Sequence, residues 1–277
     1  MNKLSLAKRT QIVACLVEGN SIRATCRMTG AAKGTVLKLL ADLGYACWTY
    51  QDQTLRDLPC KRVQCDEIWS FCYAKQKNVE TAKAAPEDAG DVWTWTAICA
   101  DTKLVPSFMV GPRDSDMARA FMFDLASRMA GRIQLTTDGH GAYPHAVEDA
   151  FGSDGVDYAQ LVKMYGAPQE SETRYSPATC TGCRRENKLG DPDRAHISTS
   201  YVERQNLTMR MSMRRFTRLT NAFSKKVENL GHAVALHFMH YNFCRIHKTL
   251  RVTPAMEAGV SDHVWSIEEL VGLLGSN

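Results

Sequence analysis

RVQCDEIWSFCYA, residues 62–74, is the stretch that decides the fold class of this chain. Apolar and polar residues largely alternate along it, and a period of two is typical of a β-strand with one buried face. Two adjacent carboxylates, Asp66 and Glu67, stand in the middle of the predicted strand. Because successive side chains point to opposite faces of a sheet, we expect only one of the two to face a site there, and the spacing alone does not say which.

The residues after this strand predict the rest of one α/β domain, which we assign to residues 62–250. Two more strands follow closely and suggest an antiparallel meander. An amphipathic helix comes next, with Asp114 or Ser115 as its N-cap. Strand-strand-strand-helix-strand-helix is the order of a ribonuclease-H-like domain, so we predict that fold with a mixed sheet. The predicted elements are strands at 92–101 and 104–111, a helix at 114–130, a strand at 132–138, a helix near 140–151 and a strand near 157–163.

The first 48 residues predict an all-α unit that precedes this domain. Ser21 is a good N-cap and Gly30 a good stop for the second of three short helices. Apolar positions recur at helical spacing and close a small trihelical core, which is helix-turn-helix architecture. The last helix of that motif enters the major groove, so we expect Lys33, Thr35 and Lys38 to contact DNA. A plain packing or dimerisation module is the alternative. The helices are predicted at about 6–18, 21–29 and 32–43.

The remaining segments show weaker patterns. Residues 44–61 have no clear period and are interpreted as a linker, with the boundary between the two domains placed at 49–61. Residues 165–198 are rich in Pro, Gly, Ser, Thr and charge and are interpreted as an insertion. Further helices are expected at about 199–213 and 222–246, followed by a polar C-terminal tail, 251–277, with one short helix at 266–274.

The distribution of charge is more informative than the formal net charge of +4. Residues 1–48 carry seven Lys or Arg against two Asp or Glu, which gives +5, and residues 184–226 carry eleven against four, which gives +7. A local positive face is what a nucleic-acid binder needs, although each segment alone is also typical of a solvated surface. No apolar run approaches the roughly 20 residues that cross a bilayer, so we expect an intracellular protein without a membrane partner.

Three carboxylates stand where the predicted domain order would bring them together. Asp66 lies within the first strand, Asp138 ends the fourth, and Glu203 lies in the later helix. Phosphodiester cleavage needs a nucleophile that is deprotonated near neutral pH and compensation of the developing charge, and divalent ions held by carboxylates supply both. Each acid also has a structural interpretation. Asp138 precedes Gly139 as a common turn residue would, and Glu203 competes with several other acids that follow Asp138.

Four strings of residues carry a resemblance to a known family, and together they span nearly the whole chain. CDEIW, TTDGH, YVERQN with Arg210 after it, and YNFCRIHKTLRVTPA closely resemble the transposases of the insertion-sequence-one family. The resemblance implies a ribonuclease-H-like DDE catalytic domain behind a helix-turn-helix, and recognition of the inverted terminal repeats of an insertion sequence. The strings occupy residues 65–69, 136–140, 201–206 and 241–255.

The same resemblance implies roles for individual residues and partners. Asp66, Asp138 and Glu203 take the catalytic and metal-binding positions, which favours Asp66 over Glu67, and Arg210 takes the basic position after the last acid. Magnesium is the implied cofactor, and we expect manganese to substitute for it. The implied partners are double-stranded DNA, as terminal repeats and as target, and further copies of the chain, because two element ends must be joined. The implied location is the cytoplasm of a bacterium, in association with the nucleoid.

A second DNA contact is predicted in the basic helix MRMSMRRFTRLTNAFSKK, residues 209–226. Arg214, Arg215 and Arg218 follow Arg210 there and are expected to track the phosphate backbone. Zinc is not expected as a cofactor. Cys180-Thr-Gly-Cys183 has the spacing of half a zinc site, but a structural zinc ion usually takes four ligands.

Two rival functions share these sequence features. One is a non-catalytic DNA-binding regulator in which the large domain serves only for assembly, and the intact acidic triad argues against it. The other is a structure-selective nuclease that has the same metal site but joins no strands, and the basic N-terminal unit together with the segment 241–250 favours the transposase over it.

Overall fold

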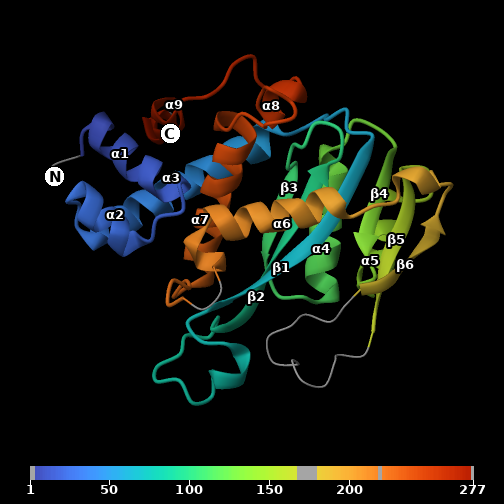
Figure 1. Cartoon of the computed structure of the whole chain (residues 1–277), viewed down its shortest axis with the longest axis horizontal. Coiled ribbons are helices and arrows are strands. Elements are labelled where there is room, and N and C mark those ends of the chain that lie inside the picture. The colour runs from blue at the N-terminus through green and yellow to red at the C-terminus, as the bar shows by residue number, and fades with distance from the viewer. Residues whose placement is uncertain (1–3, 167–179, 218–219, 276–277) are drawn as a thin grey trace.

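The computed structural model describes residues 4–166, 180–217 and 220–275. Its described strands form a six-stranded mixed sheet in the order β3-β2-β1-β4-β5-β6. Strand β1 runs antiparallel to β2 and parallel to β4, and the mixed α/β architecture that the sequence predicts is confirmed (Figure 1). The strands are β1 (Arg62–Cys72), β2 (Gly90–Cys99), β3 (Ser107–Gly111), β4 (Ile133–Asp138), β5 (Val156–Tyr165) and β6 (Cys180–Leu189).

Helices cover both faces of the sheet. On one face α4 (Ser115–Arg128) and α5 (Tyr143–Phe151) enclose Trp95, whose ring is fully buried. On the other face α6 (Ser200–Ser212) crosses in front of β1, and α7 (Val227–Met239) lies beside it (Figure 1). The element order from β1 to β5 is the order predicted from the sequence, and it is consistent with a ribonuclease-H-like fold.

Three helices precede the sheet, α1 (Leu6–Val17), α2 (Ile22–Thr29) and α3 (Lys33–Thr54). Ser21 caps α2 by accepting a hydrogen bond from the backbone N–H of Ala24, and Gly30 ends it in the left-handed conformation, as predicted. Helix α3 does not end near residue 43 as expected. It continues to Thr54, through the first half of the predicted linker of residues 49–61.

The extension of α3 has a physical cause in its packing against α7. Gly44 lets the two helices approach so closely that a Cβ there would lie 2.5 Å from the Cβ of His232. Further along, the Gln51 side-chain amide donates to the backbone carbonyl of Ala235 at 3.1 Å. Glycine and glutamine at buried positions break the apolar period, which is why this part of the sequence resembles a linker.

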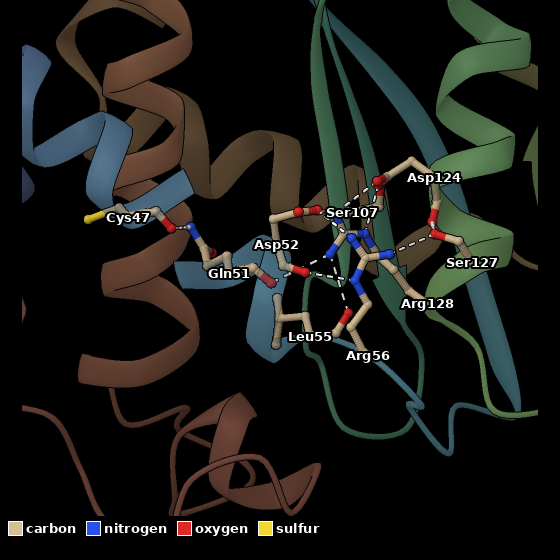
Figure 2. Close-up of polar contacts among 9 residues, drawn as sticks. All are labelled: Cys47, Gln51, Asp52, Leu55, Arg56, Ser107, Asp124, Ser127 and Arg128. Atoms are coloured by element: carbon tan, nitrogen blue, oxygen red, sulfur yellow. Dashed lines mark hydrogen bonds and ion pairs between the residues drawn. The ribbon is translucent and has the colours of Figure 1, made fainter. Parts of the chain in front are cut away.

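A cluster of polar contacts around Arg128 ties the end of α3 to α4 (Figure 2). The Arg128 guanidinium donates to Asp124 from Nε and Nη2, both at 2.8 Å, and to Asp52 from Nη2 at 2.7 Å. The Ser107 hydroxyl of β3 also bonds to Asp124, and Arg56 bonds to Asp52 at 2.6 Å. We call these residues the Arg128 cluster. It joins α3, α4 and β3 at one point. The Arg128 side chain is buried there, with only 7% of its surface exposed.

The C-terminal segment packs against the N-terminal helices. Helix α7 continues as a π-helical turn (His240–Cys244), within the predicted helix of residues 222–246. After α8 (Pro254–Glu257), α9 (Ile267–Gly272) lies against α1, with Leu270 and Val271 fully buried (Figure 1). The segment 251–277 is therefore not simply the polar tail that the sequence suggests.

Two other expectations differ from the structure. The insertion at 165–198 contains β6, an edge strand that pairs antiparallel with β5. The basic helix expected at 209–226 is not continuous, because α6 ends at Ser212 and a 3-10 turn (Arg214–Phe216) follows. Other 3-10 turns span Gln76–Asn78, Arg194–His196 and Leu273–Gly275. Among the described residues, no helix has the length and apolar character needed to cross a membrane.

Candidate active site

Helix α6 is seated on β1 by hydrogen bonds from its first turn. The side-chain oxygen of Gln64 accepts from the backbone N–H groups of Tyr201 at 2.8 Å and Val202 at 3.2 Å. One turn further along α6, Asn206 Nδ2 donates to Asp66 Oδ2 at 2.8 Å. Even-numbered side chains of β1 therefore face α6, and Glu203 lies in the same helix between these two attachments.

Asp138 comes level with Asp66 because of the strand register. Cys65 of β1 pairs with Thr137 of the parallel strand β4, so the next residues of both strands are neighbours. Asp138 ends β4, and its Oδ1 accepts from the backbone N–H of His140 at 2.9 Å, which orients the carboxylate at the start of the turn. The sequence assignment of these two acids to one place is thus consistent with the register of the sheet.

Glu203 faces the same cavity from α6. Asp66, Asp138 and Glu203 all line a cavity of about 540 Å³, together with Lys163 and Arg113. Lys163 Nζ lies 2.6 Å from Glu203 Oε1, and the Thr199 hydroxyl donates to the same oxygen. The structure therefore brings the three predicted acids to one cavity, with Glu203 held by a lysine at its edge.

Glu67 lies closer to the two aspartates than the sequence suggested. Carboxylate oxygens of Asp66, Glu67 and Asp138 all lie within 4.8 Å of one another. The alternation of the strand holds, since Asp66 contacts α6 while Glu67 points to the other face. Asp138 is close to both because it stands at the end of its strand. Asp66 lines the cavity and Glu67 does not, although the Glu67 carboxylate lies close to both aspartates from the other face.

Arg113 holds Glu67 in place. Arg113 Nε donates to Glu67 Oε2 at 3.0 Å, and Arg113 Nη2 lies 3.7 Å from Asp138 Oδ2. The Glu67 side chain is only 1% exposed, and its Oε1 has no hydrogen-bond partner among the described residues. The guanidinium thus lies between two carboxylates and compensates part of their charge.

The pKa values of the acids reflect their crowding. Burial, together with the nearby charges of Glu67 and Asp138, raises the pKa of Asp66 to about 7. Burial likewise raises the pKa of Glu67. Buried carboxylates that repel one another gain most from a bound cation, and hard divalent ions prefer carboxylate oxygens. The donor set therefore fits a hard divalent cation.

Sequence reasoning missed several residues that surround the acids. Arg113, Lys163 and Thr199 come from a loop, a strand and a helix N-terminus that only the fold brings together. Asn206 had a signal, because it stands three residues after Glu203 on one helix face. His140 lines the cavity, and its ring packs 6.0 Å from Trp95 between centroids, which is a structural contact.

None of the predicted DNA contacts among the described residues lines the acidic cavity. Lys33 is exposed at the start of α3, Thr35 is half-buried, and Lys38 is exposed with its Nζ 2.7 Å from Asp42. Arg214 and Arg215 stand in the 3-10 turn after α6, and Arg210 in the last turn of α6. Arg218 lies outside the described residues. Cys180 and Cys183 are exposed at the start of β6.

Comparisons with known proteins give remote similarities. No protein-family model matches the chain, and no curated protein matches it. Among solved structures, it resembles the piggyBac transposase in a synaptic complex with hairpin DNA, with a TM-score of 0.42 and 10% identity over 98% of this chain and 70% of that chain. It also resembles a pre-cleavage Mos1 transpososome, with a TM-score of 0.24 and 10% identity over 57% of this chain and 60% of that chain. The assignment of an activity therefore depends on this chain's own residues.

Proposed function

We propose that the chain is a DNA transposase of the insertion-sequence-one type. It binds the terminal inverted repeats of an insertion sequence and catalyses metal-dependent 3′-end cleavage and strand transfer into target DNA. The observation that carries this proposal is the meeting of Asp66, Asp138 and Glu203, from β1, β4 and α6, at one cavity of about 540 Å³. These are the three acids that the family resemblance assigns to catalysis.

Asp66 and Asp138 would hold the divalent ions, with Glu203 as the third carboxylate. When bound, such ions compensate the charge of the attacking and leaving oxygens and lower the pKa of water. The fit is supported by the crowding of carboxylate oxygens of Asp66, Glu67 and Asp138 within 4.8 Å and by the raised pKa of Asp66. Glu67, with one unpartnered oxygen, adds negative charge behind the same two aspartates.

The reaction that we propose has two displacements at phosphorus. In the first, a water oxygen attacks the phosphodiester at the element's end and the 3′ oxygen leaves as a hydroxyl. In the second, that hydroxyl attacks a phosphate of the target strand, and the target's 3′ oxygen leaves. Asn206 fixes the Asp66 carboxylate, and Lys163 and Arg113 place positive charge at the edge of the cavity, where a phosphate would approach.

DNA recognition is proposed for the two basic segments. Lys33, Thr35 and Lys38 of α3 would face the duplex as the last helix of a helix-turn-helix. Arg210, Arg214, Arg215 and Arg218 would contact phosphates. Assembly of several copies on two element ends is part of the same proposal, because strand transfer joins both ends.

The decisive experiment incubates the purified chain with labelled DNA that carries the element's own ends, with magnesium or with a chelator. We expect nicked and joined products with magnesium only. Asp138→Ala should abolish both products while DNA binding persists, because it removes a metal ligand and no DNA contact. Asp149→Ala, which removes an exposed acid of α5, is the matched control and should retain activity.

Each of the other results would favour a different function. Nicking without joining would favour a structure-selective nuclease, and end-specific binding without any product would favour a regulator. Cleavage retained by Asp138→Ala would overturn the assignment of the metal site.

A further inference from the structure

A groove of about 690 Å³ separates the N-terminal helices from the segment that follows α6. One wall is formed by the start of α2 and α3, including Arg23 and Lys33. The other wall is formed by residues 214–215 and 220–225. The groove is distinct from the acidic cavity, with which it shares none of its lining residues. We call it the basic groove.

All five charged residues among the described lining of the basic groove are cations, namely Arg23, Lys33, Arg214, Arg215 and Lys225. Four of them are exposed at the rim, and Arg215 lies deeper. Helix α2 also begins at this groove, so the positive end of its dipole adds to the field. A concave surface with one sign of charge attracts a polyanion and holds it.

Arg215 is a half-buried cation that lacks a carboxylate partner within the described part of the chain. Its guanidinium donates a hydrogen bond from Nε to the Ser224 hydroxyl at 2.8 Å. Burial lowers the pKa of Arg215 to about 10, in the direction of the uncharged form. The contrast is Arg128, which is buried and bonds to two aspartates. A buried charge without a counter-ion is costly, and an anion in the groove would remove that cost.

Aromatic side chains hold the second wall of the groove in place. The Phe223 ring packs 4.8 Å from Phe71 of β1, between centroids. Lys225 Nζ lies 4.9 Å from the Tyr73 ring and 5.4 Å from the Phe223 ring. These contacts anchor the wall to β1, the strand that carries Asp66. The second wall of the groove and Asp66 of the acidic cavity are therefore attached to the same strand.

We propose that the basic groove binds the sugar-phosphate backbone of one DNA strand, with a phosphate paired to Arg215. The inference rests on the proposed function and deepens it, because it joins the contacts of α3 and of the segment after α6 into one continuous binding site. A backbone contact of this kind positions the duplex between the helical unit and the acidic cavity, and it carries no sequence preference of its own.

The first test measures DNA affinity by fluorescence anisotropy in chelator, where no cleavage occurs, over a range of salt concentrations. Arg23→Gln and Lys225→Gln each remove one exposed groove cation without disturbing the core. We expect each to weaken binding about equally on end DNA and on unrelated DNA, and to reduce the slope of log K against log salt by about 1. Arg119→Gln removes an exposed cation from α4, on the other face of the sheet, and is the matched control.

The second test uses Arg215→Met, which keeps an unbranched apolar side chain at this position and removes the charge. If Arg215 pairs with a DNA phosphate in the complex, the melting temperature of this variant, measured without DNA, should equal or exceed that of the parent chain. The variant should also bind DNA at least tenfold more weakly. If Arg215 is only structural, the melting temperature should fall and the affinity of the folded protein should stay the same.

These outcomes distinguish a failure of the groove proposal from a failure of the proposed function. If the groove variants match Arg119→Gln in DNA affinity and in salt slope, the proposal that the groove binds DNA is wrong. Magnesium-dependent joining by the same preparations would still support the proposed transposase function. Failure of the unsubstituted chain to bind DNA at any salt concentration overturns both.

Discussion

Asn206 is the residue that connects helix α6 to Asp66 of β1. Its Nδ2 donates to Asp66 Oδ2 at 2.8 Å, and its side chain is buried between α6 and β1. Ligands of metal ions need such outer partners, because a carboxylate that is free to rotate holds the ion in several geometries. Loss of an outer partner commonly lowers affinity or activity by about 10- to 100-fold.

We therefore predict that Asn206→Leu lowers the rate of end cleavage by about 10- to 100-fold and leaves DNA affinity unchanged, because the loss affects Asp66 and no DNA contact. The measurement is single-turnover cleavage across a magnesium titration, with anisotropy for binding. Thr208→Val, on the same helix, is the control, since the Thr208 hydroxyl only bonds to the backbone of Arg204. A variant that cleaves at the parental rate at every magnesium concentration would contradict this role.

The acids of the site could be predicted from the sequence and their neighbours could not. Asp66 and Asp138 belong to strands with clear patterns, so the order of elements already suggested that they meet. The alternation of side chains along β1 predicted that Asp66 and Glu67 point to opposite faces. That prediction of direction is correct, but it takes no account of Asp138, which lies close to both acids because it stands at the end of β4. Lys163 and Arg113 reach the cavity through long-range contacts, and no local period carries that information.

At the scale of elements, the Arg128 cluster is a buried polar link from the end of α3 to α4 and β3 (Figure 2). Its central guanidinium is 7% exposed and bonds to Asp124 and Asp52. Removing one member of such a group leaves buried charge without compensation, which costs more than the group contributes when it is complete.

Arg128→Met is accordingly predicted to lower the free energy of unfolding by about 3 kcal/mol, because Asp124 and Asp52 lose their common cation. Urea denaturation followed by circular dichroism measures it. Lys38→Met breaks a pair of the same spacing on α3, Lys38 with Asp42, but that pair is exposed. Its expected cost is below about 0.5 kcal/mol. Equal costs for the two variants would show that burial does not set the strength of the cluster.

Elements with one buried apolar face were predictable from the sequence. Elements with glycine or polar residues at buried positions, or without a buried face, were not. Strands β1 to β5 and helix α4 follow their periods closely, and the structure places them within a few residues of expectation. Helix α3 was cut short because Gly44 and Gln51 occupy buried positions where apolar residues are expected. Strand β6 is an exposed edge strand with charged residues between Arg184 and Lys188, so it has no buried face from which a period could be recognised.

At the scale of the whole molecule, the two ends of the described chain support each other. Helix α9 packs on α1, and the Trp265 ring before it lies 5.0 Å from Tyr50 of α3 and 5.5 Å from Phe243. The helical unit that we propose to read DNA is thus part of a larger core and includes a C-terminal contribution.

Leu270→Ala should show this dependence. Leu270 is fully buried in α9, and its truncation is expected to cost about 2–5 kcal/mol. Hydrogen exchange is expected to rise in α1 as well as in α9, because the two helices lose a shared contact. Val264→Ala, at an exposed position of the same segment, is the control and should change neither. Faster exchange in α9 alone would mean that α1 is stable without it.

The continuity of α3 has a consequence for how such a protein changes during evolution. The helix has 22 residues, which is a length of about 33 Å, and it runs without a break from the proposed duplex contact at Lys33 to the Arg128 cluster. If the helical unit reads base pairs, the offset between those base pairs and the severed bond is a fixed dimension of the folded protein. A lineage could not alter that offset by lengthening a loop, because each added residue would also rotate the helix by about 100°. The spacing within the element's ends and the length of this helix would therefore have to change together.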